Sequence, residues 1–304
     1  MNILVTGASG FIGSHLCREL VRKKHRVAGL TRSGRTEYIT SLLTNETFSL
    51  HTGDVNDTEL IQQIIEENGI KTVFHLAAKL PNKDDMSNPL SSFDINARGT
   101  ASVANAAASK NVGKYIYIST MSVYSEPPSY LPVDEEHPAQ PHTIYGITKR
   151  IGELCCNLYD KRMTVIILRY AGVYGKYCRA SDAVPTFVRQ ALNNQPLTID
   201  GDGAQSSDFV HIDDIIEGSI LAWEKGEPGI YNLGSGQEVS VRELAEKVIN
   251  LTGSKSEIMK TTNRSDRPYR FVMDITKARK LPGYSPQSID EGLCHYLANL
   301  GHNR

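Results

Sequence analysis

Two residues four positions apart in the segment YGITK have the chemistry of an acid-base pair. Tyr145 and Lys149 lie within 143–161, a stretch whose apolar spacing predicts a helix, so both side chains project from one face. A tyrosine with an ordinary pKa of about 10 is a poor proton donor or acceptor near neutrality, but a neighbouring ammonium favours the phenolate and lowers that pKa. Such a pair can act as general acid and base in hydride transfer at a carbinol or carbonyl carbon. The same spacing occurs by chance on many surface helices, so it needs support from other features.

Two further features supply that support. Gly7, Gly10 and Gly13 follow a predicted strand and open a predicted helix, a context suited to binding the pyrophosphate of a dinucleotide at a helix N-terminus. Ser119 and Thr120 end another predicted strand, where a hydroxyl could hydrogen-bond a substrate oxygen. The order of glycine turn, strand-end hydroxyl and YxxxK pair indicates an enzyme that uses a dinucleotide cofactor.

The elements that must position these residues alternate regularly up to residue 170. Short β-branched or aliphatic runs predict six strands, at 2–7, 26–31, 47–54, 72–78, 114–120 and 164–170. Amphipathic stretches predict helices between them, at 11–24, 57–68, 90–110 and 143–161. This alternation predicts an α/β fold, a doubly wound Rossmann fold whose mostly parallel sheet is covered on both faces.

Beyond residue 170 the regular alternation of strands and helices ends, and turn-forming residues become more frequent. Short helices are expected at 185–194, 240–252 and 288–300. Residues 206–224 and 229–235 look like elements that return to the sheet. We therefore predict a dinucleotide-binding domain over 1–170 plus about 208–235, and a smaller α/β substrate domain over 171–207 and 236–304.

Composition limits the partners and the location of the protein. The 304 residues carry 33 basic and 34 acidic side chains without a long run of one sign, which disfavours nucleic acid and anionic membranes as partners. MNILVTG begins directly as a strand and no run of about 18 apolar residues exists, so we expect a cytoplasmic protein. The five cysteines lack the paired spacings of a metal or redox site, so we expect no metal.

The chain resembles the extended short-chain dehydrogenase/reductases, within the nucleotide-sugar epimerase, dehydratase and reductase family. The resemblance covers nearly all of the chain and rests on TGASGFIG, GDVND, HLAA, DINARGT, STMSVY, YGITK, LRYAGVYG, GDGAQSSDFVHIDD and RPYRFVMDITKA. It implies that Thr120, Tyr145 and Lys149 are catalytic, with Lys149 also bonding the nicotinamide ribose. It further implies that Asp54 accepts a hydrogen bond from the adenine amino group, and that Asn96 supports the active-site backbone and water.

These motifs define the predicted site. The cofactor-binding set is Gly7, Gly10, Phe11, Ile12, Gly13, Thr31, Arg32, Ser33, Arg35, Asp54, Val55, Leu76, Ala77, Ala78, Asn96, Ser119, Tyr145 and Lys149. The substrate-binding set is Thr120, Ser122 and Arg267, with the Arg267 guanidinium as the expected partner of a sugar diphosphate. The expected partners are a nucleotide sugar and a second copy of the chain, because in this family the alanine-rich helix near 96–111 and the YGITK helix form a four-helix dimer contact.

Several positions depart from the family pattern. Dehydratases of the thymidine-sugar type carry an Asp-Glu pair after the catalytic threonine, where this chain has Met121 and Ser122, so that reaction is disfavoured. An asparagine common in epimerases is replaced by Gly172, and an arginine by Ser207. Whether these two changes signal a substrate without a nucleotide stays open.

The segment LTRSGR bears on the choice of cofactor. An acidic residue after the second strand would bond both ribose hydroxyls of NAD and repel the 2′-phosphate of NADP, but Thr31 stands there, followed by Arg32, Ser33 and Arg35. We therefore predict NADP as cofactor, with NAD as the alternative. A reductase must exchange its cofactor, so this favours an NADPH-dependent 4-keto-sugar reductase. The alternatives are a UDP-glucose 4-epimerase-like enzyme with tightly bound NAD and, more remotely, a non-catalytic regulator that binds the cofactor.

Overall fold

A computed structural model describes residues 1–81, 88–261 and 269–302 of the chain. The chain divides into two compact units. The first unit comprises Met1–Ser125, Pro138–Arg169 and Ser219–Tyr231, and the second comprises Glu126–His137, Tyr170–Gly218 and Asn232–Arg304. Residues 208–218 and 232–235 thus fall in the second unit, whereas the predicted nucleotide-binding domain included them; the domain boundaries themselves stay a prediction.

A seven-stranded sheet organises the first unit. Its strands are β1 (Asn2–Thr6), β2 (Arg26–Thr31), β3 (Phe48–Thr52), β4 (Thr72–His75), β5 (Lys114–Thr120), β6 (Thr164–Tyr170) and β10 (Gly229–Leu233). The order is β10-β6-β5-β4-β1-β2-β3, and the pairs from β3 to β5 are parallel. All four residues of β4 are buried, which explains why such strands read as continuous apolar runs rather than alternating ones.

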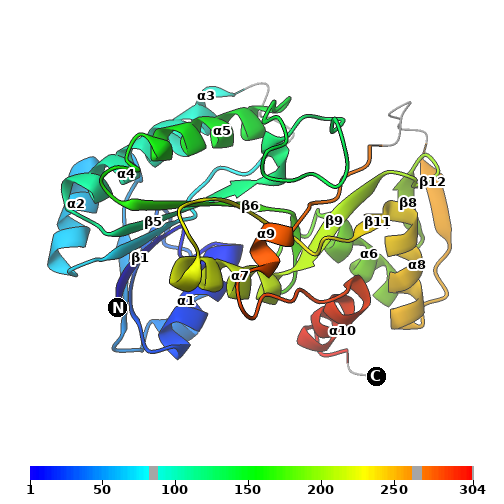
Figure 1. Cartoon of the computed structure of the whole chain (residues 1–304). Helices are drawn as coiled ribbons and strands as arrows, with labels where there is room; N and C mark the ends of the chain where they lie inside the picture. Colours follow the sequence, from blue (N-terminus) through cyan, green and yellow to red (C-terminus); the bar gives the residue numbers. More distant parts are fainter. Residues whose placement is uncertain (82–87, 262–268, 303–304) are drawn as a thin grey trace. The chain divides into compact units, whose positions relative to one another are not determined.

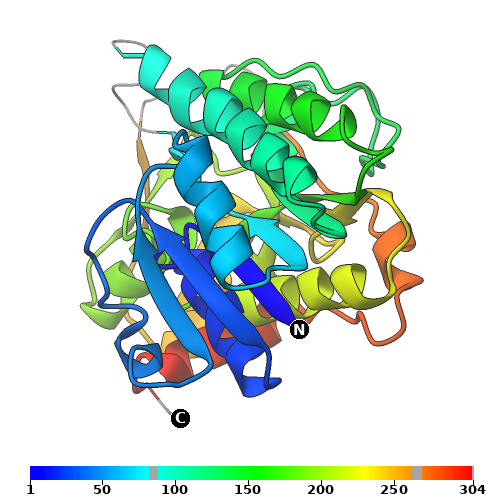
Figure 2. The same cartoon turned by 90° about the vertical axis from the view of Figure 1, so that its left-hand side faces the viewer.

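Helices cover both faces of this sheet (Figure 1). On one face lie α2 (Thr58–Glu67), α4 (Gly99–Ser109) and α5 (Ile144–Asn157), and Figures 1 and 2 both show α4 and α5 side by side. On the other face lie α1 (Phe11–Arg22) and the C-terminal part of α7 (Ile212–Lys225), where Trp223 donates a hydrogen bond to Thr72 Oγ1 at 3.2 Å. Short pieces complete the unit: η1 (Thr40–Leu42), α3 (Leu90–Ser92) and η3 (Met121–Val123).

The predicted helix over 90–110 is interrupted. Between α3 and α4 the segment η2 (Phe93–Arg98) has the wider hydrogen-bonding pattern of a π-helix, and it contains Asn96. Single π-turns inside α-helices are rare and are frequently found at functional sites.

The second unit has its own small sheets and core. A three-stranded sheet is formed by β7 (Gly172–Tyr174), β9 (Ser206–His211) and β11 (Glu238–Ser240), and a two-stranded one by β8 (Leu197–Asp200) and β12 (Ile258–Thr261). The helices are α6 (Ala183–Leu192), α8 (Val241–Thr252), α9 (Thr276–Arg279) and α10 (Ile289–Asn299). One apolar cluster joins residues of α6, α8 and α10, including Phe187, Leu244 and Leu293.

The predicted α/β Rossmann class and all six predicted strands are confirmed. The expectation that 206–224 and 229–235 both return to the main sheet is right for β10 and wrong for β9. Strand β9 pairs instead with β7 and β11. The buried carboxylate of its Asp208 also accepts hydrogen bonds from the backbone N–H groups of Ser235 and Gly236, in the loop before β11.

Candidate active site

The turn between β1 and α1 leaves no space for a side chain at Gly7 or at Gly13. Gly7 has a φ of +72°, and a Cβ on it would lie 2.9 Å from the backbone nitrogen of Ala77. A Cβ on Gly13 would lie 2.1 Å from Gly7 O. Gly10, as the N-cap of α1, has no side chain to occupy the first N–H groups of the helix. The N–H groups of Gly7, Ala8 and Gly10 are used within the protein, so the donors that the site presents to a pyrophosphate are those of the first turn of α1.

A pocket of about 340 Å³ opens beside this turn, and all its lining residues belong to the first unit. The predicted residues that line it are Gly7, Gly10, Phe11, Ile12, Gly13, Thr31, Arg32, Ser33, Asp54, Val55, Leu76, Ala77, Ala78, Tyr145 and Lys149. The lining residues that sequence reasoning missed are Ser9, Leu30, Gly53, Lys79, Leu80, Ile95 and Ile118. All of these except Leu80 are immediate chain neighbours of a predicted residue, so adjacency was the signal that could have found them.

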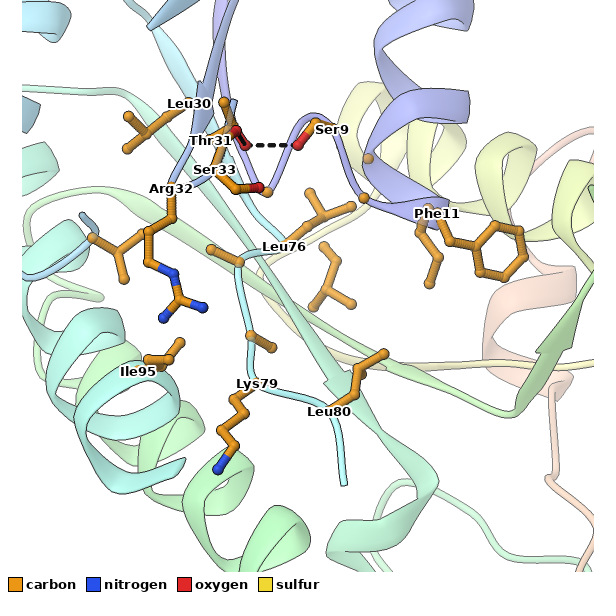
Figure 3. Close-up of a pocket in the computed structure, with 18 of the residues that line it drawn as sticks. Ser9, Phe11, Leu30, Thr31, Arg32, Ser33, Leu76, Lys79, Leu80 and Ile95 are labelled. Carbon is orange, nitrogen blue, oxygen red and sulfur yellow. Dashed lines mark hydrogen bonds between the residues drawn. The ribbon is translucent and has the colours of Figure 1, made fainter. Parts of the chain in front are cut away.

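The end of β2 supplies hydroxyls and one cation to the pocket (Figure 3). Thr31 Oγ1 lies 2.6 Å from Ser9 Oγ and donates a hydrogen bond to Ser33 O at 3.0 Å, which ties the glycine turn to the end of β2. The Arg32 side chain extends from the end of β2 toward Ile95. Arg32 forms no ion pair with any residue that the structure describes, so its charge is available to an anionic ligand. Arg35 is exposed and is not among the lining residues.

The catalytic pair of the prediction lies on one helix beside the pocket. Thr143 caps α5 by accepting a hydrogen bond from the Gly146 N–H at 3.0 Å, so the helix begins at Ile144 and Tyr145 falls in its first turn. Lys149 follows one turn later, and both side chains line the pocket. Lys149 is only 2% exposed, and burial lowers its pKa from 10.5 to about 7.

The hydroxyls at the end of β5 have different surroundings. Successive residues of a strand point to opposite faces, and Ser119 donates a 2.5 Å hydrogen bond to the buried carboxylate of Glu153 on α5. Thr120 Oγ1 accepts a hydrogen bond from Ser122 N–H at 3.2 Å and donates to Ser122 Oγ at 3.4 Å. Thr120 is thus buried beside the half-buried Ser122, and the Ser119 hydroxyl is hydrogen-bonded inside the protein. None of the three is among the pocket-lining residues.

Glu153 is the centre of a buried ion network beneath this strand end. Its two oxygens accept hydrogen bonds from Arg169 at 2.9 and 2.8 Å, and Arg150 adds a third at 2.7 Å. Burial alone would raise the pKa of Glu153, but the hydrogen bonds and charge of Arg169, with those of Ser119 and Arg150, hold it below its ordinary value. This network of hydrogen bonds joins the ends of β5 and β6 to α5.

Asn96 lies outside the pocket lining and braces its edge. Its Oδ1 accepts a hydrogen bond from Lys79 N–H at 2.7 Å, and its Nδ2 donates to Lys79 O and to Thr148 Oγ1, each at 3.0 Å. Thr148 in turn donates to Tyr145 O at 3.0 Å. A single fully buried amide therefore holds the segment after β4 against the helix that carries Tyr145.

His75 was missed by sequence reasoning and belongs to the same polar layer. Its Nδ1 lies 2.7 Å from Thr6 Oγ1, which accepts the Ala77 N–H, and its Nε2 lies 3.0 Å from Thr100 Oγ1, which donates to Asn96 O. This chain of donors assigns the proton to Nε2 and leaves the ring neutral. Burial, with the nearby charge of Lys149, lowers the pKa of His75 to about 3. The HLAA motif was noted in the sequence. The role of its histidine could not be predicted, because its hydrogen-bonding partners Thr6 and Thr100 are distant in the sequence.

Other predicted positions lie elsewhere. Arg267 falls outside the described residues. Asp54 lines the pocket, and its Oδ1 accepts hydrogen bonds from the backbone and side-chain nitrogens of Asn56, both at 2.9 Å. Gly172 and Ser207, which depart from the family pattern, are neighbours in the second unit: a Cβ on Gly172 would lie 3.9 Å from Ser207 Oγ.

Comparison with known proteins finds relatives that match nearly the whole length of the chain. A putative UDP-glucose 4-epimerase from Methanocaldococcus jannaschii is 33% identical over 302 residues, 96% of this chain and 95% of that protein. The crystal structure of a UDP-glucose 4-epimerase from Thermotoga maritima with UDP-glucose aligns with a TM-score of 0.91, 28% identity and 99% coverage of both chains. A UDP-glucuronic acid 4-epimerase from Bacillus cereus, in complex with UDP-glucuronic acid and NAD, aligns with a TM-score of 0.88, 32% identity and 99% coverage of both chains.

Residues 3–234 match the NAD dependent epimerase/dehydratase family, and the chain belongs to that family. The predicted resemblance is thereby confirmed, as is the prediction that the chain is an enzyme. Over the residues that the structure describes, no helix combines the length and apolar character needed to cross a membrane.

Proposed function

We propose that this enzyme is a nucleotide-sugar 4-epimerase, which inverts the configuration at carbon 4 of a UDP-hexose. The observation that carries the proposal is the location of Tyr145 and Lys149, one helical turn apart on the wall of a dinucleotide-sized pocket. Full-length likeness to 4-epimerases supports it. Met121 and Ser122 stand where thymidine-sugar dehydratases carry an Asp-Glu pair and cannot supply the proton transfers of water elimination. Because the full-length relatives include 4-epimerases, the 4-epimerase is preferred over the reductase among the reactions considered from the sequence.

The described residues fit a nicotinamide dinucleotide. A Cβ on Gly7 or Gly13 would collide with backbone atoms, so this turn is built for close packing around a pyrophosphate at the N-terminus of α1. Arg32 and Asp54 would hold the adenosine end, and Lys149 the nicotinamide ribose. When bound, the nicotinamide accepts a hydride from the sugar and returns it.

The protein's own residues would transfer the proton of the sugar's 4-hydroxyl group. The phenolate of Tyr145 takes the proton from the 4-hydroxyl of the sugar, and Lys149 stabilises that phenolate by its charge. Thr120 orients the sugar oxygen. After the keto sugar has turned over within the site, Tyr145 would return the proton to the oxygen at carbon 4. An epimerase of this type needs no net supply of cofactor.

The test is interconversion of UDP-glucose and UDP-galactose by purified protein, followed by nuclear magnetic resonance without added cofactor. We expect equilibration of both sugars starting from either one, and mass spectrometry should find a dinucleotide retained on the protein. Absence of interconversion for a panel of UDP-, dTDP- and GDP-hexoses, with cofactor supplied, would refute the epimerase. Tyr145→Phe protein serves as the control for contaminating activity.

A second candidate is an NADPH-dependent 4-keto-sugar reductase, and the end of β2 favours it. Thr31, Arg32 and Ser33 line the pocket where an acidic residue would otherwise exclude a 2′-phosphate. Solved relatives bind NAD, as in the complex from Bacillus cereus, and NADP is our proposal for this chain alone. Stoichiometric oxidation of NADPH by a 4-keto sugar nucleotide, without epimerisation, would establish the reductase. Absence of both activities in a protein that binds the cofactor would revive the regulator as an alternative.

We also propose that two copies of the chain associate through α5 and the segment 90–98. Large apolar side chains are exposed along this surface of the first unit: Leu90, Phe93, Ile147, Leu154 and Leu158. Leu158 is 78% exposed, which is unfavourable for an isolated surface. Light scattering should give the mass of a dimer, and Leu154→Glu with Leu158→Glu should give a monomer. A monomeric wild-type protein at micromolar concentration would exclude the dimer. Cytoplasmic location likewise stays a prediction, which cell fractionation tests.

A further inference from the structure

The side chain of Lys149 is buried, and its ammonium lies over the face of an aromatic ring. Its Nζ lies 4.2 Å from the centroid of the Tyr117 ring, and Tyr117 is fully buried on β5. Within the described residues, no carboxylate forms an ion pair with Lys149. A cation over the face of an aromatic ring is attracted by its quadrupole, more strongly when both are removed from water.

We infer that Tyr117 is a positioning residue, whose ring holds the Lys149 ammonium charged and aimed into the cofactor pocket. The inference rests on the proposed function for the part in which Lys149 tunes Tyr145. It concerns a contact between β5 and α5 that the sequence motifs do not contain, since the two residues are 32 positions apart.

The Tyr117 ring is fixed in this orientation from two sides. Its hydroxyl donates a hydrogen bond to Lys149 O at 3.3 Å. It can reach that carbonyl because residue 152, one turn further along α5, is glycine: a Cβ there would lie 2.1 Å from the hydroxyl oxygen. The ring therefore passes beneath the very turn of α5 from which the Lys149 side chain departs.

Besides the Tyr117 ring, Cys156 and Glu153 on α5 also favour the charged form of Lys149. On α5, Glu153 is already engaged by Arg169 and Arg150, and burial raises the pKa of the Cys156 thiol far above neutrality. Tyr145, also on α5, is the group that Lys149 serves. On β4, His75 stacks on Tyr117 with ring centroids 5.8 Å apart, and its ring is neutral.

The consequence concerns the protonation state of Lys149 at working pH. Burial lowers the pKa of Lys149 to about 7, so a modest further loss of stabilisation would discharge it near neutrality. Without the ring, less ammonium would be present at pH 7 to 8, and less positive charge would be available to stabilise a Tyr145 phenolate. The pH range in which both groups are in their working states would become narrower.

A series of substitutions at position 117 can vary the electrostatic potential of the ring face while the shape of the ring stays nearly constant. Tyr117→Phe keeps the ring, and mono-, di- and trifluorinated phenylalanine at position 117 then weaken its negative face at nearly constant volume. The pKa of Lys149 is read directly from the Cε resonance of ¹³C-lysine protein, assigned with Lys149→Met. We expect Tyr117→Phe to stay close to wild type and the fluorinated series to lower the pKa of Lys149 stepwise, by about one pH unit in all.

The matched control is the same series at Tyr115. Tyr115 is fully buried on β5 two residues earlier, on the same face of the strand, and also lies near His75, but it makes no contact with Lys149 among those the structure describes. Fluorination there should leave the pKa of Lys149 unchanged. Equal shifts at both positions, or no shift with fluorination at position 117, would overturn the inference.

The rate profile separates this inference from the proposed function. The alkaline limb of the pH-rate profile should move down together with the pKa of Lys149 in the fluorinated series. If the pKa moves while the rate profile stays fixed, the Tyr117 contact stands and the catalytic role proposed for Lys149 fails. Because the resonance is measured without substrate, the test of Tyr117 holds even for a protein with no epimerase activity.

Discussion

A Cβ atom on Gly152 would lie 2.1 Å from the hydroxyl oxygen of Tyr117, closer than non-bonded atoms approach. This contact brings β5 and α5 together directly below Lys149.

Gly152→Ala should therefore destabilise the protein and reduce its activity. Overpacking of this kind costs about 1–3 kcal/mol in the free energy of unfolding, because either the ring or the helix must move. Urea denaturation measures that loss. Gly113→Ala is the control, since its added methyl group meets only Lys71 O at 3.7 Å. Equal stability of the two variants would show that the helix relaxes without strain.

Tyr145→Phe tests the proposed acid-base group. The variant keeps the ring and removes the proton donor, so cofactor binding should persist while turnover falls by about 100-fold or more. Steady-state kinetics and a cofactor titration measure the two effects. Tyr130→Phe, which removes an exposed phenol of the second unit, should behave as wild type. Near-normal turnover of Tyr145→Phe would remove this residue from the mechanism.

Arg32→Ala tests the proposed contact with a 2′-phosphate. A charge-assisted hydrogen bond is worth about 1.5–3 kcal/mol, so NADPH should bind about 10- to 100-fold more weakly while NADH binding hardly changes. Thr31→Asp combined with Arg32→Asn should invert the preference, because a carboxylate repels the phosphate. Fluorescence titration gives the dissociation constants. Arg35→Ala should have a smaller effect, because Arg35 does not line the pocket. Equal affinity of the wild type for both cofactors would rule out this contact.

Glu153→Gln tests the buried network beneath the strand end. Removing one partner of a buried ion pair leaves an uncompensated charge and costs about 3–5 kcal/mol. The double variant Glu153→Leu with Arg169→Met should be less destabilised than Glu153→Gln, as urea unfolding at pH 7 would show.

The same network makes a prediction for low pH. The pKa of Glu153 is lower in the folded protein than its ordinary value of 4.5, so its contribution to stability is fully present above about pH 4.5 and is lost as the pH falls through the folded value. The wild type should therefore lose more stability than the double variant below pH 4.5. Parallel acid profiles would show that another group controls acid unfolding.

Much of the first unit follows from local patterns. The mostly apolar runs of β1, β2 and β4 and the helix-length segments between them predict a parallel sheet, because a strand that is covered on both faces has few positions for solvated side chains. Gly7 and Gly13 were identified because a dinucleotide turn restricts those positions to glycine. Tyr145 and Lys149 were found because helical geometry places residues i and i+4 on one face.

What surrounds these residues could not be predicted in the same way. Strand β9 was expected in the main sheet, and it lies instead beside β7 and β11, where Asp208 accepts hydrogen bonds from a loop 27 or more residues away. Ser119 was expected near the cofactor, and its hydroxyl is bonded to Glu153, 34 residues along the chain.

The sequence by itself determined which residues are candidates for the proposed chemistry, because motifs such as YGITK and TGASGFIG reflect constraints that act over one turn of backbone. Only the tertiary structure decided their electrostatic environment. The charge of Lys149 depends on the Tyr117 ring, and Asn96 is joined to Lys79 and Thr148, through contacts between β5, η2 and α5. Side chains become buried and find their hydrogen-bonding partners only when these elements pack together. Strands and helices with the same local pattern could pack with other side chains in contact, so the sequence pattern does not define these partners.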